Sequence, residues 1–381
     1  MVWSHLFITR HPAANRPLRG APIFCQRGPE VPALLRPRVP ADEGGDCLHP
    51  GLVAPASRIY FTSRFTFHAS RLSPVRIITQ ASELNPGQRK VCGAIGMFDG
   101  VHLGHQQVIR QTIQDARQHE AVAVAITFDC HPNSVVAPER NPPLVQSLPQ
   151  KLRVIELLGI DTTLLIHFDK AFSEISGEQF IRGLARDFGH IHSLCVGSAF
   201  TFGHRRGGNI SLLKRLGQDL HFIVHGLASV SLDGRGVSST RIREALVAGN
   251  LDGASQMLGR TYALRGRVVR GDQIGRQLGF PTANLEFAGL AVPPDGVYAV
   301  HASVQGRCHR AVANIGIRPT LRNPDPQRQV EVHLLDFSAD LYDQEIEIAF
   351  VEKLRDEGKF PSPEALRDQI RRDVEVARTL F

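Results

Sequence analysis

The chain has 381 residues, of which 42% are hydrophobic and 21% charged, a composition typical of a globular protein long enough for two domains. No apolar run approaches the about 18 residues that a membrane-spanning helix needs, so we expect no membrane partner. Residues 1–72 hold nine Arg and four acidic residues, so the other 309 residues carry only +2 of the net charge of +7. Because the basic charge does not gather on a folded region, we expect no nucleic-acid partner.

Residues 1–72 differ from the rest of the chain. They contain no Lys, many Arg and Pro, and no sustained hydrophobic period. We interpret them as an extension that is either disordered or the product of a misassigned start. A transit peptide is also Arg-rich and acid-poor, but the proline density and the lack of an amphipathic helix weaken that interpretation.

Residues 73–258 alternate between apolar strands and amphipathic helices, which predicts a parallel α/β sheet. The expected strands cover residues 91–96, 121–129, 162–169, 193–200 and 221–227. The expected helices cover residues 102–118, 147–159, 176–189, 210–218, 238–249 and 250–258. Ser147 opens one of these helices, and Ser176 with Gln179 has the spacing of a capping box.

Residues 259–381 show a different period. Short β segments separated by Gly, Pro, Asn and Asp cover residues 262–271, 296–306, 308–316, 329–337 and 345–354. They predict a small antiparallel barrel, followed by a C-terminal helix that Ser362 can cap. The six cysteines form no Cys-x-x-Cys pair, which predicts free thiols in the reducing cytoplasm and neither a zinc site nor a disulfide framework.

The turn GMFDGVHLGH, residues 96–105, joins a strand to a helix. Such a turn exposes backbone N–H groups at the positive end of a helix, and glycines let a phosphate approach them. His102 and His105 lie on one helical face and can reach the same ligand. A glycine turn with two surface histidines, or a metal pair that lacks a third ligand, fits the same residues. Asp99 can either order this turn or lie near Mg²⁺.

Two further segments carry candidate chemistry. Ser238, Ser239 and Thr240 begin a helix whose hydroxyl and N–H groups can hold phosphates, and Arg243 can bind an anion there. A capped surface helix with solvated arginines would look the same. Glu331 lies in QVEVHLLDF, where the alternation of the strand by itself favours an ordinary exposed residue. His131 can orient a phosphate or serve as a capping or packing residue.

The ordered set of motifs resembles the prokaryotic bifunctional riboflavin kinase/FMN adenylyltransferase (FAD synthetase) family. The strings that carry the resemblance are GMFDGVHLGHQQVI, TFDCHP (residues 127–132), VGSAFTFGHRRGG (196–208), VSSTRIREAL (237–246) and GRQLGFPTANL (275–285). The resemblance covers residues 75–381. It implies a Rossmann-like nucleotidyltransferase domain over residues 73–258 and a barrel-shaped riboflavin kinase domain over residues 259–381.

The resemblance also implies roles for residues. Those implied to be catalytic are Glu331, His102, His105 and Arg243. Those implied to bind ATP or phosphate are Gly96, Phe98, Asp99, Gly100, Gly104, Ser238, Ser239, Thr240, Gly271, Gly275, Gly279 and Pro281. Phe200, Phe202 and Arg205 are implied to bind flavin, and Thr282 and Asn284 to hold Mg²⁺.

The activities implied are phosphorylation of riboflavin to FMN and adenylylation of FMN to FAD, with ATP and Mg²⁺. The expected partners are riboflavin, FMN and ATP, with at most a weak or transient oligomer. Competing interpretations are another nucleotidyltransferase, an aminoacyl-tRNA synthetase, or a binding protein without activity. The family usually has Asn or Asp where this chain has Ala199, so we expect one polar group to be missing there. Ser198 should face away if the strand alternation continues.

Overall fold

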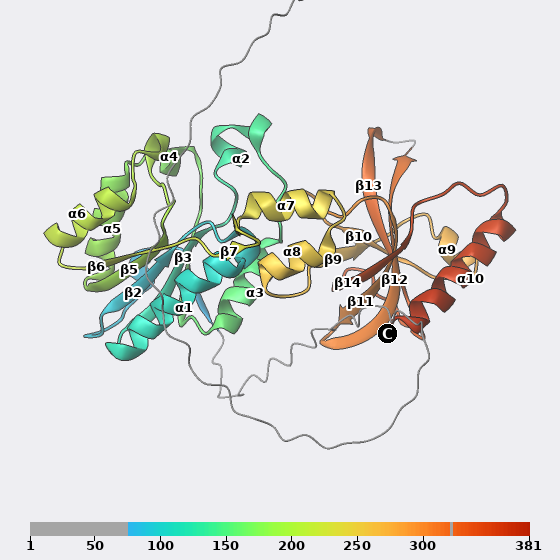
Figure 1. Ribbon diagram of the computed structural model, residues 1–381, viewed down its shortest axis with the longest axis horizontal. Coiled ribbons are helices and arrows are strands. Elements are labelled where there is room, and N and C mark those ends of the chain that lie inside the picture. Colours follow the sequence, from blue (N-terminus) through green and yellow to red (C-terminus); the bar gives the residue numbers. More distant parts are fainter. Residues whose placement is uncertain (1–74, 321–322) are drawn as a thin grey trace, which may run out of the picture. The chain divides into compact units, whose positions relative to one another are not determined.

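The computed structural model describes residues 75–320 and 323–381, apart from the side chains of residues 318–327 (Figure 1). The expectations for residues 1–72 lie outside this part of the chain. Within it, a parallel sheet with helices is followed by a closed antiparallel barrel and a C-terminal helix. The predicted fold class is therefore confirmed.

Six parallel strands form the first sheet, in the order β1-β4-β3-β2-β5-β6. They are β1 (Arg76–Ile78), β2 (Val91–Ile95), β3 (Val122–Phe128), β4 (Thr162–Ile166), β5 (Ile191–Gly197) and β6 (Ile223–Leu227). The other elements of this part are α1 (Leu103–Gln118), α2 (Asn133–Val136), α3 (Leu148–Leu158), α4 (Lys170–Ser173), α5 (Gly177–Phe188), α6 (Ile210–Asp219), the hairpin β7 (Ser231–Leu232) and β8 (Arg235–Gly236), α7 (Ser239–Val247) and α8 (Leu251–Leu258). The strand order reverses between β2 and β5, and open α/β sheets bind ligands at the carboxyl ends of such strands.

The alternation of side chains along each strand decides which helices cover which face of the sheet. Small residues, including Cys92, Ala94 and Ala125, pack against α1 and α3. Larger residues, including Ile95 and Ile126, pack against α5 and α6 on the other face. Because both faces are covered, the central strands are apolar throughout, as the sequence indicated.

The barrel closes in the order β10-β13-β12-β11-β14-β9, and all its pairs are antiparallel. Its strands are β9 (Ala263–Val269), β10 (Ala283–Glu286), β11 (Gly296–Val304), β12 (Arg307–Thr320), β13 (Asn323–Leu334) and β14 (Glu345–Arg355), with helices α9 (Ile274–Gln277) and α10 (Pro363–Thr379). Val330 and Val332 are fully buried inside the barrel. Helix α10 packs outside it, where Ala377 and Val374 contact Val297 in one apolar cluster (Figure 1).

The starts of three predicted helices are confirmed by their caps. Ser147 and Ser176 begin α3 and α5, and the capping box between Ser176 and Gln179 is present. Ser362 caps α10. The sequence did not indicate β1 and β10, because strands of 3 and 4 residues are too short to show alternation. Both exist through the backbone hydrogen bonds of their neighbours.

Arg260 lies where the chain passes from α8 to β9. Its guanidinium donates hydrogen bonds to the carbonyl oxygens of Gly100 at 2.8 Å and Val101 at 3.3 Å, and to the side-chain oxygen of Gln146 at 2.7 Å. Burial lowers its pKa to about 10, so the side chain stays charged at neutral pH. The entry to the barrel is thereby bound to the turn that follows β2.

We expect Arg260→Met to lower the free energy of unfolding by about 2–3 kcal/mol, because the acceptors around the guanidinium lose a charged donor. Urea denaturation followed by circular dichroism measures this loss. The matched control is Arg267→Met, which removes the exposed ion pair of Arg267 with Asp343. That variant should lose much less, since surface pairs contribute little. Equal losses in the two variants would contradict the role given to Arg260.

Candidate functional site

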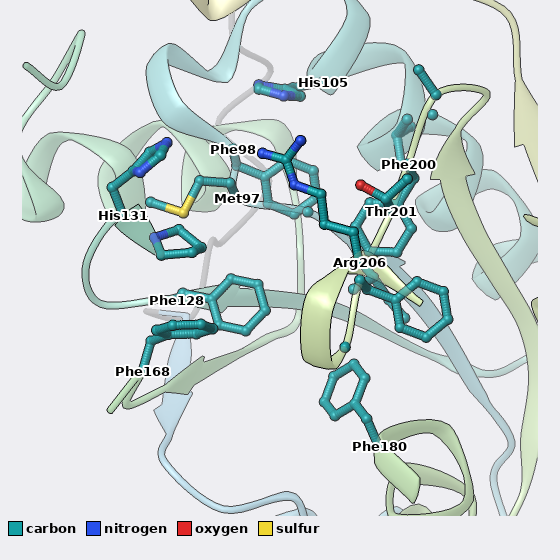
Figure 2. A pocket seen from close by; sticks show the side chains of 18 of the residues that line it. Met97, Phe98, His105, Phe128, His131, Phe168, Phe180, Phe200, Thr201 and Arg206 are labelled. Carbon is teal, nitrogen blue, oxygen red and sulfur yellow. The ribbon is translucent and has the colours of Figure 1, made fainter. Parts of the chain in front are cut away.

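A cavity of about 860 Å³ opens at the carboxyl ends of β2 and β5 (Figure 2). Ile95 and Gly96 line it from β2 and the turn beyond, and Gly197 lines it from the end of β5. Figure 2 shows His105 and His131 on its wall, with phenylalanine rings below them. The cavity therefore lies at the point of the sheet where the strand order reverses.

The glycines of the turn 96–105 allow its backbone conformation and the close approach of side-chain rings. Phe98 adopts a left-handed conformation with φ 52°, and Gly100 follows with φ 78°. A Cβ atom on Gly96 would lie 2.7 Å from the ring of Phe98, so only glycine lets this ring fold back beside the strand. A Cβ on Gly104 would approach the ring of His102 to 3.2 Å. The turn thus brings backbone and two histidine rings close to the cavity.

Asp99 fixes this turn to distant segments. Its carboxylate accepts a hydrogen bond from the N–H of Val145 at 2.9 Å and pairs with Arg243 at 2.9 Å. Its carbonyl oxygen accepts a bond from the hydroxyl of Ser239 at 2.9 Å. Of the two roles that the sequence left open for Asp99, these contacts support the ordering of the turn.

His102 and His105 lie together, with stacked rings whose centroids are 3.6 Å apart. Nδ1 of His102 accepts the N–H of His105 and caps α1. Burial and the charge of Arg260 lower the pKa of His102 to about 4. Burial also lowers the pKa of His105 well below its usual value. Both rings are therefore neutral at pH 7.

Lys151 is a buried cation that the sequence analysis missed. Its ammonium donates hydrogen bonds to the carbonyl oxygens of Met97 at 3.3 Å and Phe128 at 2.6 Å, beside the cavity. Burial lowers its pKa to about 8. Its position four residues before Ile155, on the buried face of α3, was the available signal, because residues four apart share a helix face.

The N-terminus of α7 carries the serines and Arg243 that the sequence singled out. Ser238 is the N-cap and accepts the N–H of Arg241 at 3.2 Å, while Ser239 and Arg243 are bound to Asp99. Nε of Arg243 is buried, and no described residue accepts a hydrogen bond from it. Thr240 is exposed. The start of α7 is thus bound to the turn that holds Asp99, and Nε of Arg243 remains available to donate a hydrogen bond to a ligand.

Phenylalanine rings form an aromatic wall in the cavity (Figure 2). Phe200 and Phe202, which the sequence indicated, are stacked at 5.2 Å. The sequence analysis missed the other members, which are Phe128, Phe168, Phe172 and Phe180. They come from three segments, which are the end of β3, residues 168–172 and α5, and only the fold brings these segments together. A wall of this kind suits a planar, apolar ring system.

The expectation that Ser198 faces away from the cavity loses its basis in the structure. Strand β5 ends at Gly197, and Ser198 and Ala199 lie in the turn beyond it, where both are exposed and both line the cavity. Strand alternation does not apply after the last strand residue. Arg205 also lines the cavity, as does its neighbour Arg206, which the sequence analysis did not name.

His131 lines the same cavity, and its Nδ1 accepts the N–H of Asn133 at 3.1 Å. This contact holds the ring against the backbone at the start of α2, whose N-cap is Pro132. The ring also remains beside the cavity, so the alternative from the sequence, a contact with phosphate, stays a prediction.

The candidate site residues of the barrel lie on its outer face. Glu331 pairs in register with Asn284 on one neighbouring strand and with Asn314 on the other. Since Val330 and Val332 point inward, Glu331 points outward with both asparagines.

The glycine-rich loop closes over this face. A Cβ on Gly271 would lie 2.4 Å from the side chain of Asn284, and one on Gly275 would lie 3.1 Å from the hydroxyl of Thr282. Gly279, with φ 88°, follows α9, and the carbonyl oxygen of Pro281 lies 2.9 Å from Nδ1 of His333. The fold therefore brings together Glu331, Asn284, Thr282 and the loop.

Comparisons with known proteins match both parts of the chain. The FAD synthetase family model matches residues 85–241, and the riboflavin kinase model matches residues 258–381. A bifunctional riboflavin kinase/FMN adenylyltransferase from Haemophilus influenzae is 38% identical over 288 residues, which cover 75% of this chain and 93% of that protein. Its counterpart from Pseudomonas fluorescens is 36% identical over 306 residues, 80% of this chain and 98% of that protein.

The crystal structure of a protein described as a macrolide-efflux protein from Streptococcus pneumoniae has a similar fold. It superposes with a TM-score of 0.69 and 28% identity, over 80% of this chain and 99% of that one. In the described part of the present chain, no helix combines the length and apolar character that crossing a membrane requires.

The low pKa of His102 predicts a pH dependence of stability. Between pH 6.5, its usual pKa, and about 4, its pKa in the fold, the unfolded chain binds a proton that the folded chain does not. Stability therefore falls as the pH is lowered through this window, by up to ~1.4 kcal/mol per pH unit from this residue. Urea unfolding at pH 7 and pH 5 measures the fall. His102→Asn keeps a capping oxygen without the titration and should show a smaller fall. The same fall in both proteins would refute this assignment.

Proposed function

The chain belongs to the family of bifunctional riboflavin kinase/FMN adenylyltransferases, and from this membership we propose how its residues divide the two reactions. The enzyme phosphorylates riboflavin to FMN and adenylylates FMN to FAD, with ATP as the second substrate of each step. We assign adenylylation to residues 73–258 and phosphorylation to residues 259–381. The placement of the two family matches, at residues 85–241 and 258–381, supports this division.

In the adenylylation, a phosphate oxygen of FMN attacks the α-phosphorus of ATP. A new P–O bond forms, the bond from the α-phosphorus to the bridging oxygen breaks, and pyrophosphate leaves. No proton has to leave the attacking phosphate, so the protein mainly positions groups and stabilises negative charge. The cavity with its two neutral histidines is the observation that carries this proposal.

The histidines act as neutral hydrogen-bond donors to the phosphates of ATP. Because Nδ1 of His102 accepts the N–H of His105, the proton of the neutral ring is on Nε2. Gly96, Phe98, Gly100 and Gly104 bring the backbone of the turn near these phosphates, and Asp99 holds it in place.

The start of α7 receives the leaving pyrophosphate. Ser238, Ser239 and Thr240 supply N–H groups at the positive end of the helix, and Arg243 supplies the charge. The buried Nε of Arg243, which has no acceptor among the described residues, supports this role. The aromatic wall holds the flavin rings, with Phe200, Phe202 and Arg205 among the contacts.

In the phosphorylation, Glu331 accepts the proton of the 5′-hydroxyl of riboflavin, and the oxygen of that hydroxyl attacks the γ-phosphorus of ATP. The bond from that phosphorus to the bridging oxygen breaks, and ADP leaves. Gly271, Gly275, Gly279 and Pro281 form the loop that covers the phosphates. The outward position of Glu331 beside Asn284 supports this assignment.

Thr282 and Asn284 would hold Mg²⁺ with ATP. Each offers an oxygen, the donor that this cation prefers, and the loop leaves no room for a Cβ at Gly271 above Asn284. When bound, Mg²⁺ neutralises charge on the phosphate oxygens of ATP. The protein residues position the cation and the hydroxyl against each other. We place the enzyme in the cytoplasm, with riboflavin, FMN and ATP as its partners.

Incubation with riboflavin and MgATP, followed by chromatography for FMN and FAD, tests the two activities together. Another nucleotidyltransferase would form neither flavin product. A binding protein without activity would leave riboflavin and ATP unchanged.

We expect Glu331→Gln to reduce FMN formation from riboflavin by about 10²- to 10⁴-fold, because the general base is lost. Added FMN should still be converted to FAD, since the other site is untouched. Separate assays with riboflavin and with FMN measure the two steps. Glu286→Gln on the neighbouring strand is the control and should retain both activities. FMN formation near the wild-type rate in Glu331→Gln would refute the assignment.

We expect Ala199→Asn to raise FAD formation by roughly 10-fold or more, because a side-chain amide would add a hydrogen bond at the cavity. FMN formation should not change, and FMN should accumulate in the wild type. Ser198 lines the same cavity, and its hydroxyl is the competing donor that we test. If Ser198→Ala slows FAD formation and Ala199→Asn gains nothing, Ser198 already supplies the bond and the prediction is wrong.

A further inference from the structure

The loop from Phe202 to Gly208 is held in one conformation by its neighbours. Phe202 and Gly208 exchange backbone hydrogen bonds of 3.0 and 2.8 Å, and the N–H of His204 donates to the carbonyl oxygen of Ile175 at 2.8 Å. A Cβ on Gly203 would lie 2.2 Å from the backbone nitrogen of Gly177, so the loop packs directly on the start of α5. The path of the loop is therefore fixed by packing rather than by its own preference.

Two consecutive arginines in this loop adopt a left-handed backbone. Arg205 has φ 52° and Arg206 has φ 56°. For residues other than glycine this conformation costs about 1–2 kcal/mol each. Such residues persist where the surroundings enforce them, and they concentrate at binding sites.

The side chain of Arg206 points across the cavity toward His105 (Figure 2). Within the described residues, neither Arg205 nor Arg206 has an ion-pair partner, whereas Lys170 on the same wall pairs with Glu174 at 3.6 Å. Burial first, then the charges of Arg243 and Arg206, lower the pKa of His131. The charge of Arg206 thus reaches the wall on which His131 lies.

We propose that Arg206 binds the phosphate of FMN and selects FMN over riboflavin for adenylylation. The inference rests on the proposed adenylyltransferase function of this cavity. FMN carries its phosphate at the far end of the ribityl chain from its rings. With the rings on the aromatic wall, the phosphate has to lie toward the histidine turn, where Figure 2 shows the guanidinium of Arg206.

A guanidinium binds a phosphate through two parallel hydrogen bonds and leaves other oxygens for attack. It also offsets the repulsion between the attacking phosphate and the phosphates of ATP. Riboflavin lacks the anion and leaves the guanidinium without its partner. This selection matters in an enzyme whose other site uses riboflavin as a substrate.

The test is the steady-state kinetics of FAD formation from added FMN. Arg206→Gln should raise the KM for FMN by about 10- to 100-fold, the effect of losing a charged hydrogen bond. The KM for ATP and the phosphorylation of riboflavin should stay at wild-type values. Arg206→Lys, which keeps the charge without the fork, should lie between the two proteins.

Three further variants separate charge from backbone strain. Arg206→Gly relieves the left-handed strain and removes the charge, so it should raise the KM for FMN as Gln does. Arg205→Gln removes a charge from the same loop and should raise it less. Lys214→Gln removes an exposed charge from α6 and should leave it unchanged.

A rise in the KM for ATP alone, or a larger effect in Arg205→Gln, would overturn the proposal and assign the phosphate contact elsewhere. If Arg206→Gly has a normal KM for FMN, backbone strain and not the lost charge caused the raised KM of Arg206→Gln. That result would also overturn the proposal. Thermal unfolding confirms that each variant is folded. If the wild type forms no FAD from added FMN, the proposed function itself fails. The wild-type assay alone detects that failure, so it is distinct from a failure of the Arg206 proposal.

Discussion

The buried carboxylate of Asp99 is the contact on which the adenylyltransferase site depends. It binds the N–H of Val145 and the guanidinium of Arg243, which lie 46 and 144 residues further along the chain. The carbonyl of the same residue accepts the hydroxyl of Ser239. The turn that follows β2 is thereby joined to the segment before α3 and to α7. Breaking a buried ion pair of this kind typically costs about 3–5 kcal/mol, so the turn has little freedom to move away from its partners.

Burial sets the charge of the groups beside this turn. It keeps the rings of His102 and His105 neutral and lowers the pKa of Lys151 to about 8. The neutral rings present donors to an anionic ligand, and the permanent positive charges come from arginines instead. This division follows from chemistry, because a guanidinium keeps its proton in a buried site where an imidazole loses it. A phosphate site can then be partly buried and still remain cationic.

The barrel reaches its site by the alternation of its strands. Val330 and Val332 fill the interior, so Glu331 between them must face outward. Register then places Asn284 and Asn314 on either side of it. The same alternation made Glu331 look like an ordinary exposed residue in the sequence. The strand β10, which carries Asn284, was not apparent in the sequence, because a strand of 4 residues is too short to show a period.

The sequence by itself determined the elements whose signals are local. The apolar runs of the central strands, the serines that begin α3, α5 and α10, and the glycines around Phe98 all depend on neighbours within a few residues. The ordered motifs also pointed to the family that the comparisons then showed. Only the tertiary structure decided that Asp99 pairs with Arg243, that Lys151 lies buried under the turn, and that Ser198 lines the cavity. These facts depend on segments far apart in the chain, or on where a strand ends. Tertiary packing determines which distant segments meet and where a strand ends, and a local pattern of residue types does not show either.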